Sequence, residues 1–217
     1  MSDFVKNLED VKIQVYLDSA DLDVVSKYSS FQNIKGFTSN PSLMSKSGIK
    51  SYEEFIKKFL SISNNKPVSF EVTSDTIEEM EEQAKKIYSY SNSIYVKIPI
   101  CNTKGESTVP LLSRLSSQKI KINVTAIMLF QQVKDVIDNV NPEAEIILSI
   151  FAGRIADTGR DPEQTMLKAR DYIVKSKKDK FKTLWASVRE TYNIIQANEC
   201  GCDIITVPYD ILNKAQT

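Results

Sequence analysis

Histidine is absent from this chain of 217 residues. Its absence removes the commonest catalytic base and the commonest ligand of transition metals. Acid and base chemistry must therefore fall to carboxylates, lysine, tyrosine or cysteine. Cysteine is scarce as well. Cys101, Cys200 and Cys202 are an odd set, which argues against a disulfide framework, and "CGC" without histidine partners is a weak metal motif.

Neither sign of charge is in excess, because 28 Lys and Arg balance 28 Asp and Glu. A net charge of zero gives no reason to expect nucleic acid or an anionic membrane as the main partner. No apolar run approaches the roughly 18 residues of a membrane span, and "MSDFVKNLED" lacks the basic and then apolar pattern of a signal peptide. We therefore expect a cytoplasmic protein.

What the chain has instead is a series of apolar, β-branched runs that are typical of buried strands. There are eight, namely "KIQVYLD", "NIKGFTS", "PVSFEVT", "SIYVKIP", "KIKINVTAI", "AEIILSIFAG", "FKTLWAS" and "CDIITVP". Amphipathic stretches with apolar residues three and four apart lie between them and predict helices. These are "SYEEFIKKFLSI", "DTIEEMEEQAKKIYSY", "VPLLSRLSS", "MLFQQVKDVIDNV", "PEQTMLKARDYIVKS" and "RETYNIIQANE".

Alternation of strand and helix implies a parallel sheet, and eight such units predict a closed (β/α)8 TIM barrel. The alternative is an open doubly wound sheet, which needs a glycine-rich turn after its first strand. The chain has only six glycines and carries "LDSADLD" where that turn should be, which weakens the alternative. Because no linker suggests a second domain, we expect residues 1–217 to form a single barrel domain, with a short helix or extension at residues 1–11 and an abbreviated C-terminus.

Polar side chains and one phenylalanine fall near the ends of the predicted strands, where the active sites of such barrels are built. They are Asp18, Thr38, Asn40, Glu71, Lys97, Asn123, Thr125, Ser149, Phe151, Arg154, Ser187 and Arg189. Each alone has an ordinary structural explanation, such as an N-cap or a loop hydrogen bond. A full ring of them at one rim favours an active site.

Lys97 lies in the middle of the apolar run "SIYVKIP", where burying an ammonium group is costly. Two structural explanations are open: the amine reaches solvent, or it forms a buried ion pair with Asp18 or Glu71. The functional explanation is a Schiff-base lysine. An amine held among the apolar residues of 94–98 would have a lowered pKa and be more often the neutral nucleophile. That chemistry needs no metal and no cofactor.

Arg154 and Arg189 follow the sixth and seventh runs, and Arg189 stands where a helix should begin. Surface ion pairs of small value would explain both residues. A phosphate at the rim would also explain them, because guanidinium binds phosphate with two hydrogen bonds and helix N-termini add amide donors. A phosphorylated sugar fits this arrangement better than an acyl or nucleotide substrate.

Several of these segments resemble the transaldolase family, including its small fructose-6-phosphate aldolase branch. The similar segments are "LDSAD", "GFTSNPSLM", "YVKIPICNTKG", "INVTAIMLFQQ", "SIFAGRIADTGRDP", "WASVRE" and "GCDIITVPYDIL". They cover nearly the whole chain and occur in the family's order. Such a combination is highly specific.

The resemblance implies a role for each position. Lys97 resembles the lysine that forms an imine with the ketose donor, Asp18 resembles the acid/base that breaks the C3–C4 bond, and Glu71 with Thr125 resembles the pair that holds a proton-relaying water. Asn40, Asn123 and Ser149 resemble the residues that hydrogen-bond the dihydroxyacetone unit, and Arg154 and Arg189, with Ser187, resemble the phosphate site. Thr38 and Phe151 complete the predicted substrate-binding residues.

The resemblance leaves two activities open. Transaldolases of the pentose phosphate pathway pass a dihydroxyacetone unit from fructose 6-phosphate or sedoheptulose 7-phosphate to an aldose phosphate, whereas the aldolase branch releases free dihydroxyacetone. In that branch the positions matching Glu71 and Phe151 are usually Gln and Tyr. Phenylalanine cannot protonate an enamine, so we favour the transferase. A catalytically silent sugar-phosphate-binding protein is a third alternative.

Two departures from the family's pattern bear on assembly and redox chemistry. The chain stops soon after the eighth run at "YDILNKAQT", which leaves nothing for the C-terminal helix that small members use against neighbouring subunits. We still expect a homo-oligomer, a pentamer or decamer by resemblance. Cys101, beside the lysine strand, is either a passive packing residue or a redox-sensitive thiol.

Overall fold

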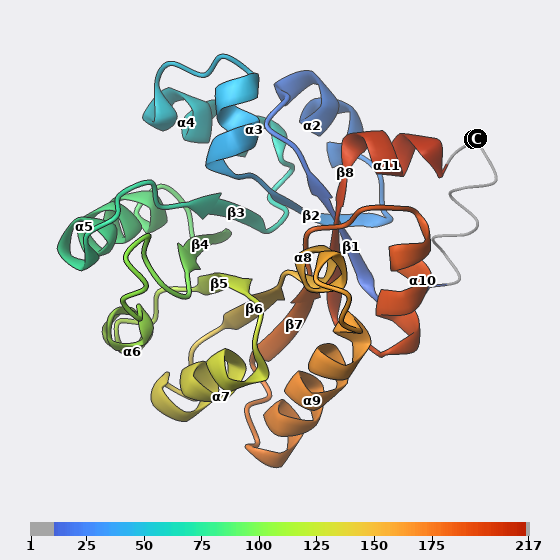
Figure 1. The fold of residues 1–217 in the computed structure, drawn as a ribbon. Coiled ribbons are helices and arrows are strands. Elements are labelled where there is room, and N and C mark those ends of the chain that lie inside the picture. Colours follow the sequence, from blue (N-terminus) through green and yellow to red (C-terminus); the bar gives the residue numbers. More distant parts are fainter. Residues whose placement is uncertain (1–10, 216–217) are drawn as a thin grey trace.

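The computed structural model describes residues 11–215, in which eight parallel strands close into a barrel in chain order (Figure 1). Every strand pairs with the next, and β1 pairs with β8. The strands are β1 (Gln14–Asp18), β2 (Ile34–Thr38), β3 (Val68–Glu71), β4 (Ile94–Pro99), β5 (Ile122–Ile127), β6 (Ile146–Ile150), β7 (Phe181–Trp185) and β8 (Ile204–Pro208). Each falls inside one of the predicted runs, so the (β/α)8 TIM barrel is confirmed and the open sheet is excluded.

Helices surround the barrel on its outer side, and the short helix α8 is drawn over the strands near the middle of the view (Figure 1). They are α2 (Leu22–Ser29), α3 (Pro41–Lys46), α4 (Tyr52–Ile62), α5 (Ile77–Tyr88), α6 (Val109–Ser117), α7 (Phe130–Asn139), α8 (Ala152–Asp157), α9 (Pro162–Lys175), α10 (Tyr192–Glu199) and α11 (Tyr209–Lys214). The six predicted helices correspond to α4, α5, α6, α7, α9 and α10. Helices α2, α3, α8 and α11 were not predicted, because six to eight residues hold too few turns for a clear apolar period. The predicted N-terminal helix or extension lies almost wholly outside the described residues.

Strand β4 shows how the barrel separates its two faces. Ile94, Val96 and Ile98 are fully buried and pack in the core between barrel and helices, whereas Tyr95 belongs to the cluster inside the barrel. Since side chains alternate along a strand, Lys97 points inward as Tyr95 does. Contrary to the prediction, Ile94, Val96 and Ile98 therefore do not surround its amine, and only Tyr95 shares its side of the strand.

The barrel interior is apolar in the middle and polar at the C-terminal ends of the strands. Tyr16, Tyr95, Ile147 and Ile204 belong to the interior apolar cluster. Two residues further along the same strands come Asp18, Lys97, Ser149 and Thr206, all facing a cavity at that end. The apolar layer thus forms the floor of the candidate site.

The packing of this apolar floor requires glycine at position 36 on β2. A Cβ atom at Gly36 would lie 2.6 Å from the ring of Tyr16 and 2.9 Å from the carbonyl oxygen of Pro67. Only glycine lets the buried Tyr16 ring cross the barrel at this point.

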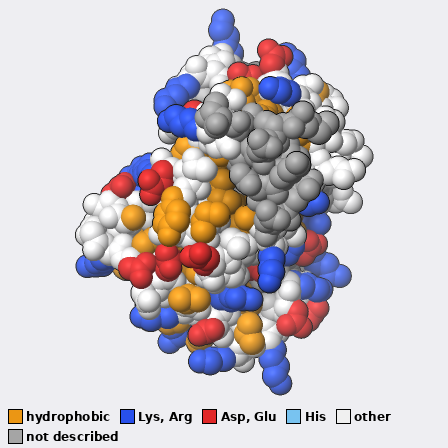
Figure 2. Space-filling model, turned by 90° about the vertical axis from the view of Figure 1, so that its right-hand side faces the viewer, with side chains coloured by type: hydrophobic (Ala, Val, Ile, Leu, Met, Phe, Trp, Pro, Cys, Tyr) orange, Lys and Arg blue, Asp and Glu red, His pale blue; other side chains and the backbone are white. Residues whose placement is uncertain are grey.

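Figure 2 shows the face that carries α10 and α11, with acidic and basic side chains interspersed on it. Apolar side chains gather on one part of the same face. The mixed charge of this face agrees with the zero net charge of the sequence. Within residues 11–215, no helix combines the length and the apolar character needed to cross a membrane.

Candidate functional site

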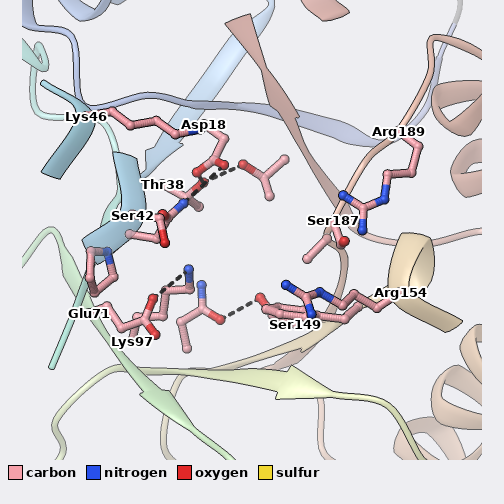
Figure 3. A pocket seen from close by; sticks show the side chains of 16 residues that line it. Asp18, Thr38, Ser42, Lys46, Glu71, Lys97, Ser149, Arg154, Ser187 and Arg189 are labelled. Carbon is pink, nitrogen blue, oxygen red and sulfur yellow. Dashed lines mark hydrogen bonds and ion pairs between the residues drawn. The ribbon is translucent and has the colours of Figure 1, made fainter. Parts of the chain in front are cut away.

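A cavity of about 570 Å³ opens at the C-terminal ends of the barrel strands (Figure 3). Its size is typical of small-molecule sites. Its lining comprises Asp18, Thr38, Asn40, Pro41, Ser42, Lys46, Glu71, Lys97, Asn123, Ser149, Phe151, Arg154, Ala186, Ser187, Arg189 and Thr206.

The structure brings together every predicted site residue except Thr125. That threonine is buried beside the site, and its Oγ1 has no hydrogen-bond partner among the described residues. The lining residues that sequence reasoning missed are Pro41, Ser42, Lys46, Ala186 and Thr206. A signal existed for three of them, because Pro41, Ser42 and Lys46 belong to the short helix directly after Asn40.

Lys97 and Glu71 form an ion pair at the bottom of the cavity. The distance from Lys97 Nζ to Glu71 Oε2 is 3.0 Å, and their side chains are only 10% and 16% exposed. The two residues are register partners on neighbouring strands β3 and β4. Lys97 Nζ also donates to the Ser39 carbonyl oxygen over 3.4 Å. Of the open explanations for Lys97, a buried pair with Glu71 is therefore present, and the amine faces the cavity as well (Figure 3).

Asp18 lies on β1, above the apolar floor, and is held by two side chains of the next strand and its loop. Thr38 Oγ1 donates to Asp18 Oδ1 over 2.6 Å, and Asn40 Nδ2 donates to Asp18 Oδ2 over 3.5 Å. Burial raises the pKa of Asp18, and nearby Glu71 raises it further, whereas Lys97 and the Thr38 hydrogen bond oppose the shift. A carboxyl with a raised pKa suits an acid/base that must both take and return a proton near neutral pH.

The raised pKa of Asp18 predicts a stability that depends on pH. Between the unfolded value of about 3.9 and the higher folded value, the folded protein binds more protons, so its free energy of unfolding falls as pH rises through that window. Asp18→Asn keeps the acceptor for Thr38 but removes this contribution. We expect the variant to gain stability relative to wild type between pH 4 and neutral pH, measured by denaturant unfolding. The exposed Asp23→Asn on α2 is the control, and an equal pH slope in wild type and Asp18→Asn would contradict the assignment.

Asn123 orients the side chain of Ser149 through a hydrogen bond. Asn123 is fully buried, its Nδ2 donates to Ser69 Oγ over 3.0 Å, and its Oδ1 accepts from Ser149 Oγ at 2.7 Å. Because the hydroxyl proton of Ser149 is donated to Asn123, the lone pairs of Ser149 Oγ remain to accept a hydrogen bond from a ligand hydroxyl.

Two arginines stand on the wall built by α8 and the loop after β7. Arg154 extends from α8, and no acidic partner is found for it within the described residues. Arg189 donates from Nη2 to Asp157 Oδ2 over 2.7 Å. Helix α10 begins only at Tyr192, so the prediction that Arg189 stands at a helix start is wrong. Arg189 lies in the loop before α10 and is tied to that helix, because its backbone N–H donates to Asn193 Oδ1 of α10.

Comparison with known proteins decides the family. A family model described as transaldolase/fructose-6-phosphate aldolase matches residues 15–217. This chain belongs to that family. The transaldolase resemblance of the sequence is thereby confirmed over nearly its full length, and an enzyme of the transaldolase/aldolase kind follows.

Relatives within the transaldolase/fructose-6-phosphate aldolase family carry a consistent description. A probable transaldolase of Thermoplasma acidophilum is 30% identical over 208 residues, which cover 93% of this chain and 87% of that protein. A probable transaldolase of Dehalococcoides mccartyi is 29% identical over 202 residues, covering 92% and 88%. An HpcH/Hpal aldolase/citrate lyase family protein from Burkholderia cenocepacia superimposes with a TM-score of 0.61 at 10% identity, covering 99% of this chain and 95% of that one. At that identity the last comparison supports the barrel fold alone.

Proposed function

We propose that this transaldolase-family chain is a transaldolase that transfers a dihydroxyacetone unit between sugar phosphates through a Schiff base on Lys97. The observation that carries the proposal is the buried Lys97 amine facing the cavity, with the Glu71 carboxylate 3.0 Å away. Both activities that the family description names require breaking the bond between the α and β carbons of a ketose, which is C3–C4 in fructose 6-phosphate. A lysine imine provides an electron sink for that step.

In the proposed reaction, Lys97 Nζ attacks the C2 carbonyl of the ketose after giving a proton to Glu71. Glu71 returns this proton to the hydroxyl of the resulting carbinolamine, which leaves as water and gives a protonated imine. Asp18, on the neighbouring side of the cavity, then removes the proton of the C4 hydroxyl. The C3–C4 bond breaks, its electron pair moves into the imine to give an enamine, and the aldose phosphate leaves. The enamine then attacks the aldehyde carbon of the acceptor, and Asp18 returns its proton to the new hydroxyl. Hydrolysis of the imine releases the product ketose from Lys97.

The wall with Arg154, Ser187 and Arg189 is proposed to hold the phosphate. All three residues line the cavity, and they lie across it from Glu71 (Figure 3). Arg154 has no ion-pair partner among the described residues, so its guanidinium is available to an anion. Arg189 would bind phosphate while its Nη2 stays with Asp157, or exchange that partner for the ligand.

Phe151 supports transfer over release of free dihydroxyacetone. Its half-buried ring packs against the interior cluster and lines the cavity. A ring without a hydroxyl has no proton to give the enamine, so the enamine persists until an acceptor arrives.

Replacing Phe151 with tyrosine is therefore expected to raise the ratio of cleavage to transfer by roughly 10- to 100-fold, since a positioned acid contributes about 10²–10⁴ to such a step. Free dihydroxyacetone and the transferred product, measured in the same reaction, give the ratio. Phe151→Leu changes the ring without adding a proton donor and is the matched control. An unchanged ratio in Phe151→Tyr would count against the proton-donor explanation.

Turnover of fructose 6-phosphate with and without erythrose 4-phosphate tests the proposed function directly. A transaldolase turns over only when the acceptor is present. Equal cleavage without acceptor would assign the aldolase activity instead, and binding without any exchange of the three-carbon unit would assign a silent binding protein. The pentose phosphate pathway, the homo-oligomer and the cytoplasmic location stay predictions.

A further inference from the structure

Thr206 belongs to the lining of the cavity, but the proposed reaction gives it no role. It lies on β8 and is only 7% exposed. Strand β1, which carries Asp18, runs between β2 and β8. Thr38 of β2 is the register partner of Asp18, and Thr206 of β8 is the register partner of Tyr16, two residues before Asp18. The two threonines thus come from the two strands that flank the aspartate.

A chain of two hydrogen bonds connects Thr206 with Asp18. Thr38 Oγ1 lies 2.6 Å from Asp18 Oδ1 and 2.5 Å from Thr206 Oγ1. A hydroxyl has one proton to donate, and an ionised carboxylate can only accept. Because Thr38 gives its proton to ionised Asp18, the proton between the two threonines must come from Thr206. The direction of both hydrogen bonds is therefore determined whenever Asp18 is ionised.

This chain stabilises the ionised carboxylate more than the protonated carboxyl. A hydrogen bond to a charged acceptor is roughly twice as strong as one between neutral groups. Hydrogen bonds in a chain polarise one another, so donation from Thr206 strengthens the bond from Thr38 to Asp18. Protonated Asp18 gains less, since both bonds then join neutral groups. The contribution matters at this position because burial raises the pKa of Asp18.

Thr206 differs from the charged groups near Asp18 because it has no part in forming the imine. The other charged side chains that line the cavity are Glu71, Lys97, Lys46, Arg154 and Arg189. Glu71 raises the pKa of Asp18 and Lys97 lowers it, but these two residues also form the ion pair of the nucleophile. Removing the Thr206 hydroxyl is therefore expected to affect Asp18 while leaving the nucleophile as it is.

We propose that Thr206 is a positioning residue that acts through Thr38: by donating to Thr38, it keeps the Thr38 proton on the Asp18 carboxylate and stabilises the form of Asp18 that removes the C4 hydroxyl proton. This inference rests on the proposed function for the reaction that Asp18 serves. It assigns to Thr206 an effect on cleavage of the C3–C4 bond and none on formation of the imine.

The test follows fructose 6-phosphate through a single turnover of Thr206→Val, which keeps the volume of the side chain but has no hydroxyl. Borohydride trapping on Lys97 gives the rate of imine formation, and released glyceraldehyde 3-phosphate gives the rate of C3–C4 cleavage. We expect imine formation as in wild type and cleavage slowed about three- to tenfold at neutral pH. The acid limb of the cleavage rate should move to higher pH by about 0.5–1 pH unit. Thr206→Ser keeps the hydroxyl and should restore both.

A double variant separates this role from simple packing. If Thr206 acts through Thr38, Thr206→Val should slow cleavage no further in a Thr38→Val background. An additive loss in that background would overturn the inference. Equal slowing of imine formation and cleavage in Thr206→Val, or the same loss in Thr206→Ser, would overturn it as well.

Failure of the proposed function is a separate result, seen as absent borohydride trapping in wild type. The inference is then decided by carbon NMR titration of the Asp18 carboxyl in the free protein, with its resonance assigned by Asp18→Asn. A higher pKa of Asp18 in Thr206→Val than in wild type would support the hydrogen-bond chain, and equal pKa values would overturn it.

Discussion

Replacing Lys97 with methionine is expected to abolish covalent trapping and nearly all activity. Incubation of wild type with fructose 6-phosphate and borohydride should add one reduced sugar unit at Lys97, seen by mass spectrometry of the peptide. Methionine has a similar volume but no amine, so no adduct should form. Turnover should fall by at least about 10³-fold, as for the loss of other covalent nucleophiles.

The same replacement should also destabilise the fold, because it leaves the Glu71 carboxylate without its partner. Glu71 is 16% exposed and has Lys97 at 3.0 Å. Removing one member of a buried pair leaves an uncompensated charge, and we expect a loss of about 2–3 kcal/mol in the free energy of unfolding at pH 7. The double variant Lys97→Met with Glu71→Gln should recover most of that loss while staying inactive.

These two readouts separate chemistry from folding. If Lys97→Met retains trapping, the imine is on another residue and the mechanism is wrong. If the single and double variants are equally stable, the ion pair is not a significant stabilising contact in solution. Glu71→Gln alone keeps the nucleophile and is expected to form the imine slowly, because the nearest proton acceptor for the amine is lost.

The barrel could be predicted from the sequence because its signal repeats along the chain. Each strand is buried on both faces, so it appears as a continuous apolar run. The runs alternate with amphipathic stretches, which leaves few topologies. The ring of functional residues followed from the same pattern, since the C-terminal ends of parallel strands meet at one rim. Asp18 and Ser149 lie on strands far apart in the sequence and still line one cavity.

What the sequence could not supply was the direction of individual side chains and the short helices. The apolar neighbours of Lys97 along the chain turned out to face away from it, and its real partner, Glu71, lies on the neighbouring strand. Lys46 was missed although it follows Asn40 closely in the sequence, because α3 is only six residues long and the place of Lys46 at the cavity depends on how that helix is capped. Side-chain partners across strands depend on register, which an apolar run does not encode by itself.

Gly153 provides the second large effect, because it determines how closely α8 approaches the loop after β7. A Cβ atom at this position would lie 1.8 Å from the backbone oxygen of Ser187 and 3.0 Å from Arg189 Cγ. Ser187 has a positive φ of 64°, so its backbone is already in an uncommon conformation and cannot move freely. An added methyl group must therefore push α8 and the Ser187–Arg189 loop apart.

Gly153→Ala is accordingly expected to spread the proposed phosphate site, which lies on both segments. The KM for fructose 6-phosphate should rise at least about tenfold, and the free energy of unfolding should fall by about 1–3 kcal/mol from overpacking. Fructose as donor carries no phosphate but still reaches the enamine by C3–C4 cleavage, so its KM should change little. Gly159→Ala is the matched control in the same segment: its methyl group meets nothing within 4 Å, but its φ of 75° makes the substitution strained. A stability loss without a rise in KM is thus expected for the control. Equal changes in KM for the phosphorylated and unphosphorylated donors in Gly153→Ala would mean that the arginine wall does not bind the phosphate.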